Sequence, residues 1–173
     1  MKGTVHKCIE KLVTEKFGIE KWQECLKAAD FDEDHVFMLN DDVDEQQTMK
    51  LITSAPAVLG ISLQQVIDAF SDYWVNVYGP KVYPSFYEGI SSAREFMEKL
   101  DNLHIHVTQT IPNAKPPRFT YSWTSGNTLE MTYSSSRGLV DLFMSMARAV
   151  GIYYNNDVQI TKKENNIVQF IFN

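Results

Sequence analysis

The chain has 173 residues, of which 44% are hydrophobic and 22% are charged. A chain of this length can bury one sizeable core but is too short for two ordinary domains, so we expect a single domain over residues 1–173. The formal net charge is -6, and no local cluster of Lys or Arg offsets it. This balance argues against a surface that binds the phosphates of a nucleic acid.

Neither a membrane span nor a disulfide framework is predicted. No apolar run approaches the roughly 20 residues that a span requires, and the first residues alternate charged and apolar groups instead of forming a signal-peptide core. We therefore expect a soluble, cytoplasmic protein without a membrane partner. Cys8 and Cys25 have neither metal-site spacing nor the density of a disulfide-rich fold, so two reduced thiols are expected.

Helical periodicity fills the first two thirds of the chain. One helix is predicted over 5–17, a shorter one over 20–29, and a third over 45–59, with Pro56 kinking or breaking it near its end. An acidic linker joins the second helix to the third. Helices therefore dominate the N-terminal part.

Two longer helices follow. Ser62 and Gln65 have the spacing of a capping box, and the apolar residues after them keep helical period up to Gly79. The other helix begins at Ser91 or Ser92 and is ended by Pro112.

The last third of the chain has β-type sequence. A hairpin is predicted from RFTYSWT and TLEMTYS, and a second from DVQITKK and IVQFIFN with a turn at 164–166. A helix over 138–151 separates them. The pattern predicts an α+β fold, with an N-terminal helical subdomain and a C-terminal four-stranded antiparallel sheet with helices.

His104 is the most informative histidine. It follows Leu100 by four residues and Met97 by seven, which places it on the apolar face of its helix, whereas His106 falls on the polar side. The residues alone leave two alternatives: a core histidine bonded to a backbone carbonyl, or a metal ligand.

A second candidate group is Tyr133, Ser135 and Arg137. In an extended chain these alternate positions share one side and would form a cradle for a carboxylate or a phosphate. An alternative stays open, in which Ser135 or Ser136 caps the next helix and Tyr133 is an ordinary strand aromatic.

These residues resemble a known family. The segment from Tyr133 to Arg137 matches the Y-x-S-x-R signature of H-NOX domains, the haem nitric oxide/oxygen binding family related to the haem domain of soluble guanylate cyclase. The opening Met1-Lys2-Gly3, the placement of His104 and the segment 115–118 (KPPR) also fit, and the resemblance covers essentially the whole chain. The chain looks like a bacterial, stand-alone member.

The resemblance implies a haem b (iron protoporphyrin IX) between the two subdomains. His104 would be the proximal iron ligand, and Tyr133, Ser135 and Arg137 would bind the propionates. The proline matching Pro117 presses on the porphyrin in this family. A rigid-loop role for this proline is compatible with that function.

Four residues are added from spacing as candidate walls of the distal pocket: Val5 and Ile9 on the first helix, and Trp74 and Tyr78 one turn apart on another. An ordinary core role is an equal alternative for all four.

Gas selectivity is expected to depend on Leu142. Oxygen-binding members of the family have a tyrosine at this position, and the neighbouring residues, Met146 included, are read as offering no hydroxyl donor. The resemblance therefore implies a haem that binds NO and CO without stable oxygen binding. The indole N–H of Trp74 and the hydroxyl of Tyr78 are the alternative donors to a distal ligand.

The implied role is signalling, not catalysis. Because the chain ends after the last strand, we expect a separate histidine kinase or cyclic-di-GMP enzyme as the partner. The rivals are an NO or haem carrier, a non-haem binding module, and an enzyme. No catalytic motif is present, and His6 and Glu10, which mimic an acid/base pair, are read as solvated.

Overall fold

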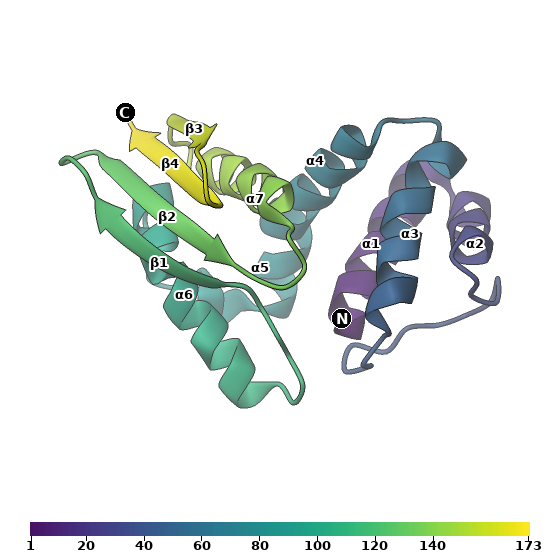
Figure 1. Cartoon of the computed structure of the whole chain (residues 1–173). Coiled ribbons are helices and arrows are strands. Elements are labelled where there is room, and N and C mark those ends of the chain that lie inside the picture. The colour runs from purple at the N-terminus through teal and green to yellow at the C-terminus, as the bar shows by residue number, and fades with distance from the viewer. The chain divides into compact units, whose positions relative to one another are not determined.

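The computed structural model describes all 173 residues and divides them into two compact units, Met1–Tyr73 and Trp74–Asn173. Each unit has its own buried apolar cluster. The fold is helical in the first unit and combines helices with a four-stranded antiparallel sheet in the second, which confirms the predicted α+β class (Figure 1).

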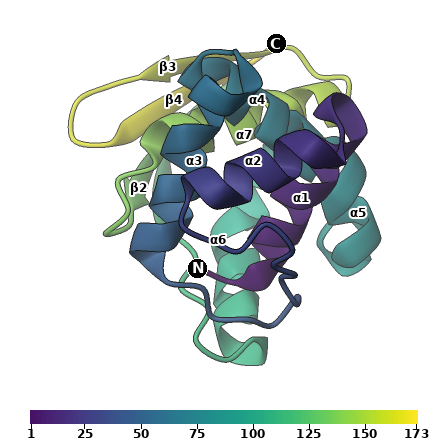
Figure 2. The ribbon, with the colours of Figure 1, turned by 90° about the vertical axis from the view of Figure 1, so that its right-hand side faces the viewer.

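The first unit contains four helices: α1 (Gly3–Phe17), α2 (Ile19–Ala28), α3 (Glu45–Leu59) and α4 (Leu63–Tyr73). Helix α2 packs against both α1 and α3 (Figure 2). Their apolar faces meet in one cluster, since amphipathic helices bury the stripe that recurs every three to four residues. Its buried members are Val13, Trp22, Cys25, Leu26, Ala29, Phe37, Leu51 and Ala55.

Helix α3 begins and ends with well-defined caps. The Asp44 side chain accepts hydrogen bonds from the backbone N–H groups of Gln46 and Gln47, at 2.8 and 3.1 Å. The helix continues through Pro56 to Leu59, so the break expected at the proline does not occur. It ends instead at Gly60, whose φ of 69° is the left-handed conformation that glycine adopts without strain.

The capping box at the start of α4 is confirmed. Ser62 N–H donates to the Gln65 side chain at 2.8 Å, and Gln65 N–H donates to the Ser62 hydroxyl at 3.2 Å.

The predicted helix end at Gly79 is wrong. The second unit opens with a π-helix, η1 (Trp74–Tyr78), which passes directly into the short helix α5 (Gly79–Val82). A Cβ on Gly79 would lie 2.8 Å from the Trp74 carbonyl oxygen and 2.5 Å from the Tyr87 hydroxyl. The glycine therefore permits close packing and does not end the helix.

The sheet of the second unit has the order β1-β2-β4-β3, with every pair antiparallel. Its strands form the two predicted hairpins: β1 (Arg118–Trp123) with β2 (Thr128–Ser134), and β3 (Val158–Lys162) with β4 (Ile167–Phe172). In the second hairpin, Asn165 and Asn166 have φ values of 55° and 59°, which is typical of a tight hairpin turn.

Three further helical segments complete this unit: η2 (Pro84–Phe86), α6 (Ala93–Thr110) and α7 (Val140–Tyr153). Helix α6 contacts β1, and α7 contacts β3 and α6, so the two helices pack on the sheet (Figure 1). Alternate residues of the strands supply the apolar face. Its fully buried members include Leu129, Met131, Val168 and Phe170.

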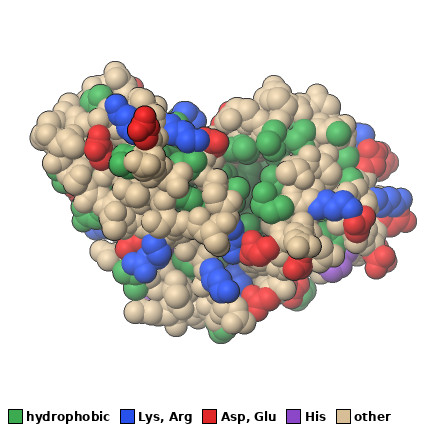
Figure 3. All heavy atoms as spheres, viewed as in Figure 1, with side chains coloured by type: hydrophobic (Ala, Val, Ile, Leu, Met, Phe, Trp, Pro, Cys, Tyr) green, Lys and Arg blue, Asp and Glu red, His purple; other side chains and the backbone are tan.

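Acidic and basic side chains are interspersed on the face seen in Figure 3. Ion pairs of the chain include Lys99 with Glu95 and Lys162 with Asp141. No single helix is long and apolar enough to cross a bilayer, although the bent pair formed by Glu45–Leu59 and Leu63–Val82 meets the criteria of length and composition.

Candidate functional site

His104 lies on α6 with one ring nitrogen hydrogen-bonded. Its Nδ1 lies 2.8 Å from the carbonyl oxygen of Pro117, and its ring lies 5.5 Å from the ring of Phe119. A carbonyl only accepts, so Nδ1 carries the hydrogen and Nε2 keeps the lone pair that binds metals. The predicted backbone-bonded histidine is found, and the same bond is the usual support of a metal-ligating histidine.

The surroundings of His104 favour its neutral form. Burial lowers the pKa of the ring below its ordinary value, and the weaker effect of the Pro117 carbonyl opposes this shift. Neutral imidazole is the form in which histidine binds a metal. His106, two residues later, is exposed, as predicted.

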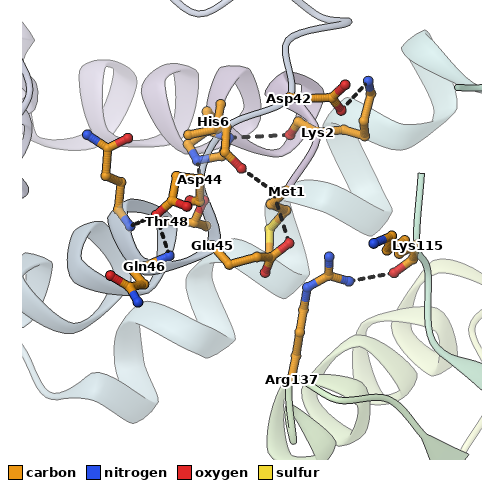
Figure 4. Close-up of polar contacts among 12 residues, drawn as sticks. Met1, Lys2, His6, Asp42, Asp44, Glu45, Gln46, Thr48, Lys115 and Arg137 are labelled. Carbon is orange, nitrogen blue, oxygen red and sulfur yellow. Dashed lines mark hydrogen bonds and ion pairs between the residues drawn. The ribbon is translucent and has the colours of Figure 1, made fainter. Parts of the chain in front are cut away.

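The segment Lys115–Phe119, which we call the proline segment, has three side-chain attachments to its unit in addition to the pairing of Arg118 and Phe119 with β2. The Arg137 guanidinium donates to the Lys115 carbonyl (Figure 4). His104 bonds the Pro117 carbonyl, and Asp101 bonds both Arg118 and Phe119. The segment is therefore held to α6 and to the turn after β2.

Asp101 is a residue that the sequence reasoning missed. Its carboxylate accepts from Arg118 Nε at 2.8 Å and from Arg118 Nη2 at 2.7 Å, the paired geometry of a guanidinium and a carboxylate. These hydrogen bonds hold the pKa of Asp101 below its usual range. Its position three residues before His104, on the same side of the helix, was the available signal.

The extended conformation predicted for Tyr133, Ser135 and Arg137 is wrong beyond Ser134. Strand β2 ends there, and the chain turns at 136–137. The Gly138 N–H donates to the Ser135 carbonyl at 3.4 Å, and Gly138 has a φ of 63°. This left-handed glycine redirects the chain into α7, so the three side chains do not alternate along one strand.

Two of these side chains accept hydrogen bonds from backbone N–H groups in or just after the turn. The Tyr133 hydroxyl accepts from the Leu139 N–H at 3.3 Å, and the Ser135 hydroxyl accepts from the Arg137 N–H at 3.3 Å. Leu139 is the N-cap of α7, without a side-chain cap, so the alternative that Ser135 or Ser136 caps this helix is wrong. Tyr133 is also a core aromatic, since it is buried and packs against Phe119 and Phe143.

The distal candidates lie on two elements. Val5 and Ile9 are half-buried on α1, where Ile9 packs against the core of the first unit. Trp74 and Tyr78 begin and end the π-helix of the second unit, with ring centroids 5.6 Å apart. Single π-helical turns are rare and often occur at functional sites.

Leu142 and Met146 lie one turn apart on α7, and both are half-buried. The reading that this helix offers no hydroxyl overlooked Ser145. Its side chain is 3% exposed, and its oxygen lies 3.4 Å from Arg148 Nη1.

The interpretation of His6 as solvated is wrong. The side chain is fully buried, with Nε2 3.0 Å from the Thr48 hydroxyl and Nδ1 3.3 Å from the Lys2 carbonyl (Figure 4). Its ring packs against Phe37 at 4.5 Å. Residues from α3 and from the loop before it cover this side of α1, which the periodicity of α1 alone does not reveal.

The sequence matches the Haem-NO-binding family (HNOB) over residues 2–162. The chain belongs to this family, the H-NOX domains. H-NOX domains are haem-based gas-sensing domains related to soluble guanylate cyclases, and they act as sensors without being catalytic themselves.

Two curated relatives of the H-NOX domain are soluble guanylate cyclases of Caenorhabditis elegans. The cyclase gcy-37 is 24% identical over 171 residues, and gcy-34 is 22% identical over 165 residues. These matches cover 96% and 92% of this chain but only 24% of each cyclase. The chain therefore spans about a quarter of the length of these relatives.

Solved H-NOX structures share the fold. An oxygen-binding H-NOX domain related to soluble guanylate cyclases, in its oxygen complex, matches with a TM-score of 0.81 at 20% identity. The match covers 99% of this chain and 95% of that one. A structure from a study of H-NOX activation matches with a TM-score of 0.85 at 19% identity, over 99% and 96% of the two chains.

Proposed function

We propose that residues 1–173 form one haem-binding domain that senses nitric oxide in the cytoplasm. In this proposal the chain binds haem b through His104, takes up NO and CO without stable oxygen binding, and regulates a separate histidine kinase or cyclic-di-GMP enzyme. The observation that carries the proposal is the hydrogen bond from His104 Nδ1 to the Pro117 carbonyl, at 2.8 Å. It prepares one ring nitrogen of this H-NOX chain for a metal.

The donor set fits a haem better than a bare metal ion. No group of three or more His, Cys, Asp or Glu side chains is arranged to hold a metal. An ion bound at His104 would therefore take most of its ligands from outside the protein, as iron in a porphyrin does. When bound, the haem supplies an iron with an open position for a diatomic gas.

The propionates of the haem are assigned to the turn after β2. Arg137 supplies the positive charge, and Tyr133 and Ser135 supply hydroxyl groups whose oxygens already accept backbone N–H groups. Both hydroxyls therefore keep their own hydrogen for donation to a carboxylate. We assign Pro117 to contact the porphyrin, because its carbonyl is hydrogen-bonded to His104, the proposed iron ligand.

The distal side is assigned to Val5 and Ile9 on α1 and to Trp74 and Tyr78 in η1. Leu142 and Met146 are proposed to keep the α7 side of the gas pocket apolar, so bound oxygen would find no hydroxyl donor at position 142. The indole N–H of Trp74 and the hydroxyl of Tyr78 are the alternative donors.

The first test compares His104→Gly with His106→Gly, because both histidines lie on α6 and only His104 is half-buried. Absorption spectra are recorded for the ferrous proteins without air, after NO and after air. We expect a Soret band in wild type and in His106→Gly that shifts with NO and not with air. His104→Gly should lose this band or recover it only with added imidazole. A wild-type protein that stays colourless after haem is supplied contradicts the proposal.

The selectivity is tested by Leu142→Tyr, with Met146→Leu as a volume-matched control on the same helix. The added hydroxyl should allow a stable oxygen complex in the variant alone. An oxygen complex in the wild type would leave haem binding intact and overturn the role of Leu142.

A further inference from the structure

The Asp101 carboxylate makes three hydrogen bonds to the proline segment. Oδ1 accepts from Arg118 Nε and from the Phe119 N–H, each at 2.8 Å, and Oδ2 accepts from Arg118 Nη2 at 2.7 Å. The Asp101 side chain is only 18% exposed, although that of Arg118 is 54% exposed. A carboxylate with a bidentate guanidinium and a backbone donor has little freedom to rotate.

These three hydrogen bonds, which we call the Asp101 clamp, lie beside the hydrogen bond that orients His104. On α6, Asp101 and His104 are three residues apart. Their partners are consecutive residues of the proline segment: His104 bonds Pro117, and Asp101 bonds Arg118 and Phe119. Two attachment points fix both the distance and the rotation of the segment relative to the helix. Without Asp101, the segment would keep its hydrogen bonds to His104 and Arg137 and its pairing with β2, but it would lose its ion pair with α6.

Phe119 extends the clamp into the core. Its N–H is held by Asp101, and its ring, only 5% exposed, lies 5.5 Å from the His104 ring and 4.6 Å from the Phe143 ring. The aromatic face against which His104 packs is therefore set by the same carboxylate.

We propose that Asp101, together with Arg118, is a positioning residue that fixes the Pro117 carbonyl on His104 Nδ1 and so sets the strength of His104 as an iron ligand. The inference rests on the proposed function. The hydrogen bond to Nδ1 controls the basicity of a ligating imidazole, and changes to such outer partners typically reduce metal affinity by about 10–100-fold.

The test uses Asp101→Ala, which removes all three bonds, and Asp101→Asn, which keeps an oxygen for the Phe119 N–H. Arg118→Gln removes the ion pair alone and serves if Asp101→Ala fails to fold. The matched control is Glu98→Gln, because Glu98 forms an exposed ion pair with Arg94 on the same helix.

Two measurements separate a positioning role from a structural one. In the ferrous haem-loaded proteins, the iron–histidine stretching band is recorded by resonance Raman, and the haem dissociation rate is measured by transfer to an acceptor globin. In the haem-free proteins, hydrogen exchange of the Phe119 amide is followed by NMR. We expect a lower, broader stretching band and about 10-fold faster haem loss in Asp101→Ala, with smaller changes of the same sign in Asp101→Asn and Arg118→Gln.

The control Glu98→Gln should match the wild type in both measurements. If Phe119 exchanges faster in Asp101→Ala while the stretching band and the haem loss stay at wild-type values, Asp101 is only structural and the inference is overturned. If the wild type takes up no haem, the proposed function itself fails, and the two failures are thereby distinguished.

Discussion

His6 in the first unit and His104 in the second differ in burial and in how many of their ring nitrogens have a partner. In the first unit, His6 is fully buried with both nitrogens near polar partners, the Thr48 hydroxyl at 3.0 Å and the Lys2 carbonyl at 3.3 Å. In the second unit, His104 is half-buried and bonds the Pro117 carbonyl through Nδ1.

The difference shows why burial alone does not identify a ligand. A histidine that satisfies both nitrogens inside the protein contributes to stability, and a metal would have to displace one of its partners. A histidine held by one nitrogen offers the other. We therefore expect His6 to control folding and His104 to control haem binding, and the predictions below test this division.

The largest expected effect on stability comes from His6→Ala. It leaves a cavity beside Phe37 and the Thr48 hydroxyl without its imidazole partner, so the free energy of unfolding should fall by about 4 kcal/mol. His104→Ala, at a half-buried site, should cost the haem-free protein about 1 kcal/mol.

Urea titrations of the haem-free proteins measure both values. Trp22 reports on the first unit because it is buried against Phe37, and replacing the other two tryptophans with Phe isolates its fluorescence. Equal losses in the two variants would contradict the division between the two histidines.

The second effect, about 3 kcal/mol, is the pH dependence of stability in the first unit. Burial is the main cause that lowers the pKa of His6 to about 4, from about 6.5 in the unfolded chain. Between these values the unfolded chain binds more protons, so the free energy of unfolding should be constant above pH 6.5 and fall as the pH drops to 4. The size follows from about 1.4 kcal/mol for each pKa unit.

The matched variant for the pH experiment is His6→Gln, which keeps a neutral polar group in place of the ring. Urea titrations from pH 7.5 to 4.5 should show a much smaller slope in this variant. The lowered pKa of His104 acts with the same sign in both proteins and cancels in the comparison. A slope that His6→Gln leaves unchanged would mean that the ring is protonated in the folded protein.

Sequence reasoning succeeded where the signal was local. The capping box of Ser62 and Gln65 spans three residues, and the placement of His104 needed only the period of its own helix. It failed for His6 because the groups that bury it, Phe37 and Thr48, follow it by more than thirty residues. A helical pattern shows which face is apolar, but it does not show what covers the polar face.

The same limit explains the two misses at the candidate site. Asp101 was overlooked because its partner Arg118 is 17 residues away, in the next element. The extended path assumed for Ser135 and Arg137 ignored Gly138, whose φ of 63° turns the chain after β2. The residues of the motif were found, but their arrangement depended on one glycine.

The smallest effects compare one helix cap in each unit. Asp44 accepts two backbone N–H groups at the start of α3, at 2.8 and 3.1 Å, whereas Ser92 accepts only one, from Glu95 at 3.2 Å, at the start of α6. Replacing either residue with Ala should cost about 1 kcal/mol in urea titrations, with the larger loss at Asp44.

The caps also test whether His104 depends on the start of its own helix. Ser92→Ala loosens α6 three turns before His104, and frayed helix ends rarely disturb residues beyond the first turn. We therefore expect the iron–histidine stretching band of Ser92→Ala to match the wild type, in contrast to Asp101→Ala. A shift of that band in Ser92→Ala would mean that the whole of α6, and not the clamp at Asp101, sets the position of His104.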